Sequence, residues 1–286
     1  MDPGRTVKLT PSSTWLAPKL LRSPSNSSTF PPAVACSCPE PYRLGRRLRQ
    51  ISVAAARRVR CHRSMSEGSG VAQPPVGVGL EQLRGAAAGC RACELWQDTT
   101  QTVFGEGPET ARIVFVGEQP GDQEDRRGEP FVGPAGRLLD RALADAGIDR
   151  RDSYVTNSVK HFSHTVKGKR RIHQTPRPEH LRACRPWLEA EFAVLQPEVV
   201  VALGATAAKS LISPSFRITR ERGRLLPWTV PGAPAPSEDD DEDAPHQTWI
   251  LATTHPSAIL RTPDEARAAA YDALVADLGV VAGALP

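Results

Sequence analysis

The sequence predicts an α/β protein, a three-layer α/β/α sandwich around a central, mainly parallel four-stranded sheet. Two observations favour this class. Four short runs are continuously apolar, and segments of helical period separate them. Strands without polar alternation are buried on both faces, and parallel strands joined by covering helices are the usual arrangement that buries them.

Each element depends on its own pattern. Leu80, Leu83 and Ala87 recur at helical spacing, and Pro178 suits a first helical turn, where a missing N–H costs nothing. Strands are predicted over 113–116, 154–157, 199–203 and 249–252, and helices over 79–96, 136–146, 178–195, 205–211 and 264–278. Because ligands bind beyond the carboxyl ends of parallel strands, a site is expected where the chain leaves these four strands.

Charge is distributed unevenly along the chain. The 286 residues carry +4, but residues 1–64 hold 12 Lys/Arg and two acids, so the remaining 24 bases and 30 acids give −6. We expect residues 1–75 to be a disordered basic tail, a targeting segment or a mis-assigned start upstream of Met65. One domain is expected over 76–286, with a solvated acidic loop at 231–246 that contains six adjacent acids, 238–243.

Membrane and secretory features are missing from the pattern. The sequence has no run of about 18 apolar residues and no continuous apolar leader, so neither a membrane span nor secretion is expected. Three of the six cysteines lie in the tail, and Cys90, Cys93 and Cys184 are therefore expected to be reduced ligands and not disulfides. A DNA partner would have to bind a local basic patch, because the net charge of the body is negative.

Polar segments follow the first and the fourth predicted strands. The segment 117–125 (GEQPGDQED) brings Glu118 and Asp122 to a strand end, and Gly121 lets a ligand approach the backbone. It lacks the Gly-Lys-Ser/Thr ending of a phosphate loop. His255 begins the other segment, 255–261 (HPSAILR). The first segment alone fits a polar turn equally well, and His255 alone fits a structural histidine, but their meeting at one sheet edge favours a site.

A basic segment and a cysteine set add further chemistry. Four bases in five positions suggest phosphate contacts or a solvated loop: Lys167, Lys169, Arg170 and Arg171. These charges disfavour protonation of His173, and a neutral imidazole is a nucleophile. Cys90 and Cys93 have the spacing of metal ligands, and Cys184 and His161 complete a set for which zinc is the ordinary expectation.

Together these segments resemble the uracil-DNA glycosylase superfamily, in its iron–sulfur branch, and within that branch the UdgX-like group. The resemblance covers about residues 78–280. Segments 117–122 (GEQPGD) and 131–139 (FVGPAGRLL) resemble the first motif and its continuation, 255–257 (HPS) resembles the second, and 169–174 (KRRIHQ) resembles the loop typical of the UdgX-like group. The combination is specific, whereas no single segment is. The tail and the acidic loop have no counterpart.

The resemblance changes the expected metal from zinc to a [4Fe–4S] cluster. Related iron–sulfur glycosylases use four cysteines, one of them just after Asn-x-Val-Lys, and His161 occupies that place here. The implied ligands are therefore Cys90, Cys93, His161 and Cys184. Histidine ligation has a precedent in Rieske centres. The cluster is expected to be structural, because glycosidic cleavage transfers no electron.

The resemblance also implies roles for the site residues. Asn157 would read the polar edge of uracil, Phe131 would stack on its face, and Gln119 and Gly121 would supply backbone contacts. His255 would bond to O2 of the leaving base. His173 would attack C1′ of the sugar, Glu118 would orient His173 or accept its proton, and Asp122 would help to place the base or water. Ser257 and Leu260 are expected DNA contacts, with Leu260 filling the gap left by the flipped base.

Three functions follow from this interpretation. The first is excision of uracil from DNA, single-stranded DNA being preferred, followed by a covalent His173–C1′ adduct. The second is ordinary turnover with water, His173 being one more residue of a basic loop. The third is a non-catalytic iron–sulfur DNA-binding protein. The Glu118, Asn157 and His255 set favours catalysis. A cytoplasmic monomer, associated with the nucleoid through DNA, is expected.

Overall fold

The computed structural model of the chain describes residues 70–231 and 248–285. Most of the predicted tail and the acidic run 238–243 lie outside the described residues. Of the tail residues that are described, Ala72 is buried, and its N–H donates to the carbonyl oxygen of Ala183. Packing against the domain therefore begins before the predicted boundary at residue 76. None of the described helices has the length and apolarity to cross a bilayer.

The central sheet has the strand order β2-β1-β5-β7-β6. Four of its strands are the predicted ones and pair in parallel: β1 (Ile113–Gly117), β2 (Ser153–Asn157), β5 (Val199–Leu203) and β7 (Thr248–Thr253). The fifth, β6 (Leu226–Trp228), pairs antiparallel with β7 at the edge. The predicted fold class is confirmed, with one additional strand that is too short to have a recognisable pattern.

Helices cover both faces of this sheet. α1 (Leu80–Ala87), α4 (Pro178–Leu195) and α5 (Ala205–Leu211) pack on one face, and α3 (Pro134–Asp145), α7 (Pro256–Arg261) and α8 (Asp264–Ala282) pack on the other. Successive side chains of β1 point to opposite faces of the sheet. Val114 and Val116 pack in the first core, and Ile113 and Phe115 pack in the second. Each such buried side chain stabilises the fold by about 1.5–3 kcal/mol, which explains the continuously apolar strands.

The first predicted helix is not continuous. The structure ends α1 at Ala87 and forms a short 3-10 helix, η1 (Glu94–Gln97), with a non-helical connection between them. Cys93, the residue before η1, has an extended backbone (φ −139°, ψ 165°). Cys90 and Cys93 both lie in this connection and not in the continuous helix predicted over 79–96. Further short elements are η2 (Arg150–Asp152), α2 (Asp122–Arg127) and α6 (Ile218–Glu221).

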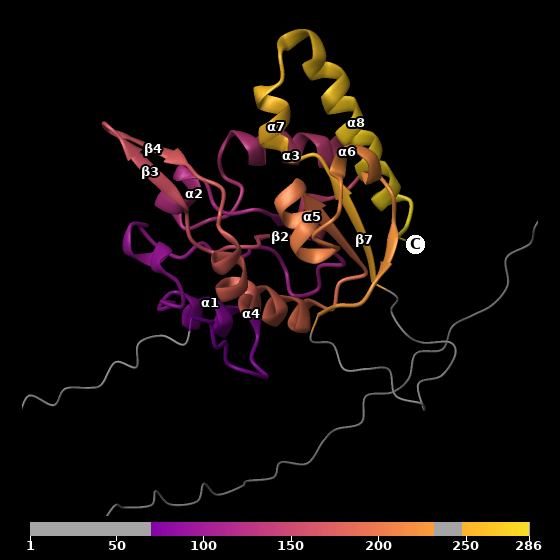
Figure 1. Cartoon of the computed structure of the whole chain (residues 1–286). Helices are drawn as coiled ribbons and strands as arrows, with labels where there is room; N and C mark the ends of the chain where they lie inside the picture. The colour runs from indigo at the N-terminus through magenta and orange to yellow at the C-terminus, as the bar shows by residue number, and fades with distance from the viewer. Residues whose placement is uncertain (1–69, 232–247, 286) are drawn as a thin grey trace, which may run out of the picture. The chain divides into compact units, whose positions relative to one another are not determined.

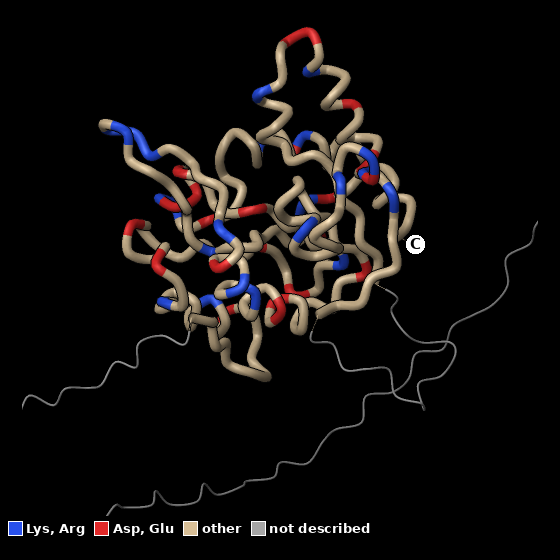
Figure 2. The backbone as a smooth tube through the Cα atoms, in the orientation of Figure 1, with Lys and Arg blue, Asp and Glu red and all other residues tan. Residues whose placement is uncertain are grey.

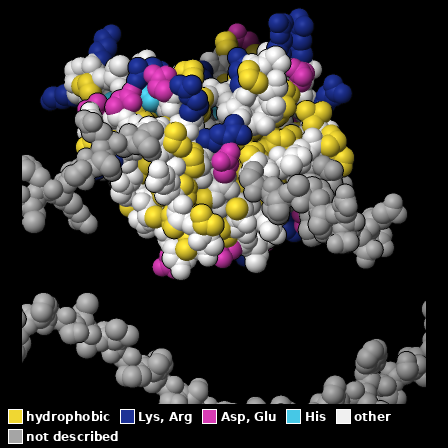
Figure 3. All heavy atoms as spheres, turned by 60° about the horizontal axis from the view of Figure 1, so that its bottom comes forward, with side chains coloured by type: hydrophobic (Ala, Val, Ile, Leu, Met, Phe, Trp, Pro, Cys, Tyr) yellow, Lys and Arg dark blue, Asp and Glu magenta, His cyan; other side chains and the backbone are white. Residues whose placement is uncertain are grey.

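The basic segment is a β-hairpin and not an irregular loop. β3 (His164–Lys167) pairs antiparallel with β4 (Arg170–His173), and Gly168 in the turn has φ 61°. The hairpin projects from the body, with Lys and Arg at its tip (Figures 1 and 2). The side formed by α1 and α4 differs: turned forward in Figure 3, it has mostly uncharged side chains, and most Lys and Arg lie along the upper edge.

Candidate active site

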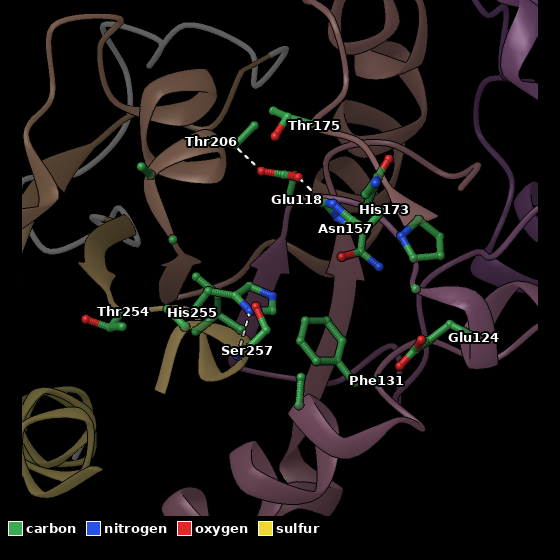
Figure 4. A pocket seen from close by; sticks show the side chains of 18 of the residues that line it. Glu118, Glu124, Phe131, Asn157, His173, Thr175, Thr206, Thr254, His255 and Ser257 are labelled. Carbon is green, nitrogen blue, oxygen red and sulfur yellow. Dashed lines mark hydrogen bonds and ion pairs between the residues drawn. The ribbon is translucent and has the colours of Figure 1, made fainter. Parts of the chain in front are cut away.

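A cavity of about 680 Å³ opens at the carboxyl ends of the parallel strands. The segments after β1, β5 and β7 and the last residue of β2, Asn157, contribute to its lining, as expected for a parallel sheet. Eight predicted site residues line it: Glu118, Gln119, Gly121, Phe131, Asn157, His173, His255 and Ser257 (Figure 4). The structure thus brings together the residues of two predicted motifs and of the hairpin.

One end of the cavity is formed by Asn157, Phe131 and His255. The rings of Phe131 and His255 are nearly parallel, with centroids 6.1 Å apart and planes at 26°. Asn157 is 3% exposed, and among the described residues its side-chain amide has no hydrogen-bond partner. The amide is therefore available to a ligand, and this end suits a flat polar ring.

Close packing against two glycines fixes this arrangement. A Cβ on Gly117 would lie 2.3 Å from Oδ1 of Asn157 and 2.9 Å from the Phe131 ring. Phe131 has a left-handed backbone (φ 58°), which is costly for a bulky residue. Its carbonyl oxygen would lie 1.5 Å from a Cβ on Gly136, at the start of α3. Both glycines are needed for Phe131 to reach the cavity.

His255 is oriented by the helix that follows it. Its Nδ1 accepts a hydrogen bond from the backbone N–H of Ser257 (3.1 Å) and caps α7. Burial, followed by the charges of Arg261 and His173, lowers the pKa of His255 to about 4. The ring is therefore neutral near pH 7. Because Nδ1 is an acceptor, the single N–H of the ring is on Nε2, where it can donate to a ligand.

The other end of the cavity pairs a carboxylate with an imidazole. Oε1 of Glu118 lies 3.4 Å from Nε2 of His173, and Oε2 accepts a hydrogen bond from the hydroxyl of Thr206 (Figure 4). Thr206 belongs to α5, so β1, β4 and α5 meet at this carboxylate. The His173 side chain is 52% exposed. An imidazole at the mouth of a cavity, beside a proton acceptor, has the arrangement of an activated nucleophile.

Two interactions fix the hairpin that carries His173. The side-chain amide of Gln119 accepts from the N–H of Ser163 (2.9 Å) and donates to the carbonyls of Ser163 and Gln174, which holds both ends of the hairpin together. Arg171 donates to Asp122 (2.5 Å) and Asp125 (2.6 Å) of α2. Its guanidinium also lies 5.4 Å from the centroid of the Phe162 ring.

These contacts change the interpretation of two predicted residues. Arg171, an expected phosphate contact, has a side chain only 15% exposed and is paired with two carboxylates. Asp122 lies outside the cavity lining and pairs with Arg126 as well as Arg171. Desolvation raises the pKa of Asp122, but hydrogen bonds and charge from these two arginines outweigh it and hold the pKa below its usual range. Both residues thus hold the hairpin against α2.

The remaining expected DNA contacts lie on the exposed surface. Lys167, Lys169 and Arg170 are at the hairpin tip, all exposed. Leu260 is 38% exposed on α7. Residues that sequence reasoning missed in or near the site are Glu124, Asp125, Thr206 and Arg261. None of them had a clear signal in the sequence: Asp125 lies one helical turn after Asp122, but α2 is too short to be recognised from its pattern.

The three cysteines of the expected metal set are neighbours, but the described side chains are not close enough to bind one metal ion together. The charges of Cys90 and Cys93 both act on Cys184, whose pKa burial raises to about 12. Two N–H groups donate to sulfur: the Lys160 backbone to Cys184 and the Trp187 indole to Cys90, each at 3.2 Å. His161 is 4% exposed, and its Nε2 lies 3.0 Å from the Thr102 hydroxyl. Within 70–231 and 248–285, no three such side chains are close enough to hold a metal ion.

A charged pair lies beneath the site, fully buried. Nζ of Lys160 lies 2.6 Å from Oε2 of Glu191, and the two side chains are 1% and 0% exposed. Lys160 also donates to the carbonyl oxygen of Asn157 (2.9 Å) and the hydroxyl of Thr156 (2.5 Å). The other carboxylate oxygen, Oε1, accepts from Tyr154 and the N–H of Gly105. The sequence does not predict this pair, because a buried Lys cannot be distinguished from an exposed one by pattern.

Comparison with known proteins identifies the family. The model of the uracil DNA glycosylase superfamily matches residues 104–279, more than half of the chain. The chain belongs to the uracil-DNA glycosylase superfamily. It is 43% identical over 173 residues to a type-4 uracil-DNA glycosylase of Thermotoga maritima, a match that covers 60% of this chain and 78% of the relative.

Two further relatives agree with this membership. A type-4 uracil-DNA glycosylase of Archaeoglobus fulgidus is 35% identical over 178 residues, 61% of this chain and 79% of the relative. One of Pyrobaculum aerophilum is 33% identical over 184 residues, 64% of this chain and 86% of the relative. The superfamily match spans every residue that lines the cavity, and it includes His161 and Cys184 but not Cys90 or Cys93.

Proposed function

We propose that the protein excises uracil from DNA and that His173 then forms a covalent bond to the exposed sugar. The relatives are named as uracil-DNA glycosylases, which supports the first step. The observation that carries the second is the Glu118–His173 pair, which lines the same cavity as Asn157, Phe131 and His255. Single-stranded DNA is the favoured substrate, because a base outside a duplex needs no unpairing.

Base recognition follows from the available amide of Asn157 and from the Phe131 ring beside it. The Asn157 amide offers one donor and one acceptor, which match a carbonyl and an N–H of uracil. Cytosine presents the donor and the acceptor in the reverse order at the same edge, so an amide held in the orientation that suits uracil would leave both groups unpaired. The Phe131 ring supplies the face on which the base stacks.

Cleavage and capture use the two histidines differently. The bond from C1′ to the base breaks with its electron pair going to uracil, and Nε2–H of His255 donates to O2 as negative charge develops there. C1′ becomes electrophilic. A ring nitrogen of His173 then gives its lone pair to C1′, and the proton that the imidazole must lose passes to Glu118. In turnover relatives water would take the place of this imidazole.

A denaturing gel with uracil-containing single-stranded DNA tests the proposal. Wild-type protein should give a complex that survives heat and detergent, because imidazole nitrogen and C1′ form an N-glycosidic type of bond. His173→Ser removes the nucleophile and leaves the base site, so it should release uracil with turnover and leave an abasic site. A stable complex formed by His173→Ser would exclude His173 as the linking residue.

His255 provides the contrasting variant. His255→Ala removes a donor to the leaving base, so excision itself should slow by about 100- to 1,000-fold, the usual effect of removing one such donor. Capture should fall only in proportion to excision. Free uracil and cross-linked protein, quantified in the same samples, separate the two defects. An unchanged rate of uracil release would show that His255 does not stabilise the leaving group.

We also propose that Cys90, Cys93, Cys184 and His161 hold a [4Fe–4S] cluster. The soft sulfur donors fit such a cluster, and N–H donors to sulfur are a recurring feature around them. His161 would have to leave Thr102 and the cysteines would have to draw together, since they form no closed group as they stand. The cluster would supply structural support between the first helix and α4.

Anaerobic purification tests this assignment directly. We expect a brown protein with absorbance near 400 nm and about four iron atoms per chain, as a [4Fe–4S] centre requires. Cys184→Ser should lose the absorbance. A colourless wild-type protein with stoichiometric zinc would contradict the iron–sulfur assignment while leaving the proposal for uracil excision intact.

A further inference from the structure

Seven of the fourteen described Lys and Arg side chains without an ion pair lie on two segments of the chain; the others, such as Arg127, Arg182 and Arg261, lie elsewhere. Most other Lys and Arg side chains are held in ion pairs, such as Arg112 with Glu198 and Arg222 with Asp277. On the hairpin and on the α5–α6 segment (residues 205–226), by contrast, seven side chains have no ion pair or side-chain hydrogen bond to any described residue: Lys167, Lys169, Arg170, Lys209, Arg217, Arg220 and Arg224.

The α5–α6 segment has an unusual local charge. Residues 205–226 contain five Lys/Arg and one acid, a net charge of +4, in a body that carries −6. The single acid, Glu221, accepts a hydrogen bond from the backbone N–H of Arg217. Arg222 turns inward to Asp277. The other four cations are exposed to solvent, where mutual repulsion makes them unfavourable for the isolated fold.

The two basic segments border the cavity from different elements, and both reach its Glu118 end. His173 and Thr175, at the end of the hairpin, line one part of it, and Ala205, Thr206 and Ile218 of α5 and α6 line another. Figure 2 shows the Lys and Arg of the hairpin tip and those around α5 and α6 well separated across the body. A strand with one nucleotide in the cavity can therefore pass both segments as it leaves.

We propose that Lys209, Arg217, Arg220 and Arg224 form a second phosphate-binding surface, which contacts the substrate strand on the side of the uridine opposite to the hairpin. The inference builds on the proposed function and adds to it the path of the strand. Each phosphate contact releases counterions, so each contributes to the salt dependence of binding. The hairpin alone would hold one flank of the strand, and two surfaces fix both flanks about the reacting nucleotide.

Binding of two single-stranded oligonucleotides tests the path. Both contain one 2′-fluoro-2′-deoxyuridine, which resists cleavage. It lies near the 5′ end in one oligonucleotide and near the 3′ end in the other, so each keeps a long flank on a single side. We expect Arg217→Gln/Arg220→Gln to lower the slope of log K against log salt by about 1.4 on one oligonucleotide, about 0.7 for each lost contact to a single strand. For the other oligonucleotide, the variant should show the same slope as the wild-type protein.

The hairpin variant and a control complete the design. Lys167→Gln/Lys169→Gln should show the opposite oligonucleotide preference. Arg112→Gln/Arg151→Gln removes the same charge before β1 and β2, at the far edge of the sheet, and should leave both slopes unchanged. Wild-type slopes for Arg217→Gln/Arg220→Gln, or an equal decrease in the control, would overturn the proposal. Release of uracil by the wild-type protein, measured separately, tests the catalytic proposal independently of this outcome.

Discussion

At the scale of single residues, the base site depends on two close approaches that only glycine allows. Gly117 ends β1 directly beneath Asn157 and Phe131, and Gly136 lies against the backbone of Phe131. A methyl group at either position would occupy space that the site residues need. The reading of a uracil edge therefore depends on residues that have no functional group.

Substitution of Gly117 measures this dependence. The added Cβ of Gly117→Ala would lie 2.3 Å from Asn157 Oδ1, so the amide and the Phe131 ring must move. Displacements of about 1 Å can cost about 100-fold in rate, and we expect a loss of that order in uracil release. The rate of release from single-stranded DNA under single-turnover conditions is the measurement.

Gly85→Ala is the matched control for that variant. Gly85 lies inside α1, and no atom lies within 4 Å of an added Cβ. Alanine in a helix interior should raise the free energy of unfolding by about 0.5–1 kcal/mol and leave excision unchanged. Wild-type rates in Gly117→Ala would mean that Asn157 and Phe131 do not hold the base in the geometry described.

At the scale of elements, the sequence predicted what is periodic and missed what is short or exposed. The four parallel strands are continuously apolar, the helices α3, α4, α5 and α8 contribute apolar side chains to the two cores, and their predicted positions agree with the structure. β3 and β4 are largely exposed, so no apolar alternation marks them. α2 and α7 have six residues each, too few to display a helical period.

The same reasoning explains the prediction of the site. The meeting of Glu118 with His255 at one cavity followed from parallel topology alone, because both residues come after strands of one sheet. The approach of His173 to Glu118 did not follow, since it requires the hairpin and its contacts with α2. Arg171 shows the difference most clearly: in the sequence it is one of four bases, whereas in the structure it is bound to Asp122 and Asp125.

The hairpin contacts predict a variant that separates capture from excision. Arg171→Gln leaves the buried carboxylate of Asp125 without its partner and frees the hairpin from α2. Asn157 and His255 are unaffected, so uracil release should stay within a few-fold of wild type. The rate of covalent capture should fall by about 100-fold, because His173 is then misplaced. Release and cross-linking are measured in one time course.

Arg170 provides the control on the same hairpin. Its side chain is exposed and has no described acidic partner, so Arg170→Gln removes an equal charge without loosening the hairpin. Capture should then keep its wild-type proportion to release. If both variants reduced capture equally, the role of Arg171 would be a charge effect and not an anchoring one.

At the scale of the whole molecule, the buried Lys160–Glu191 pair joins parts that are distant in the chain. Glu191 lies on α4, Tyr154 and Thr156 on β2, and Gly105 on the segment before β1, and all are bonded to one carboxylate. The backbone of Lys160 reaches Cys184, and its side chain reaches the carbonyl of Asn157. The pair therefore connects the sheet, the helix α4 that carries Cys184, and the end of the cavity that contains Asn157.

Burial of two charges is costly unless both are paired and fully hydrogen bonded, and this pair meets that condition. Removal of one partner leaves the other charge buried without a counter-ion, which typically lowers the free energy of unfolding by about 3–5 kcal/mol. We therefore expect Lys160→Met and Glu191→Gln each to lower the free energy of unfolding substantially, with Lys160→Met more harmful because Met offers no hydrogen bond, whereas the amide oxygen introduced by Glu191→Gln can still accept one from Lys160. Urea denaturation followed by circular dichroism measures both values.

The double variant Lys160→Met/Glu191→Gln decides whether the pair acts as a unit. Because no unpaired charge is left buried, the double variant should lose less stability than Lys160→Met alone. A double-mutant cycle quantifies this coupling between the two residues. The carbonyl oxygen of the introduced amide would still accept from Tyr154 and Thr156, so most of the network would remain. A double variant whose loss equals the sum of the single losses would show that Lys160 and Glu191 stabilise the protein independently. In that case their ion pair would not be what joins β2 to α4.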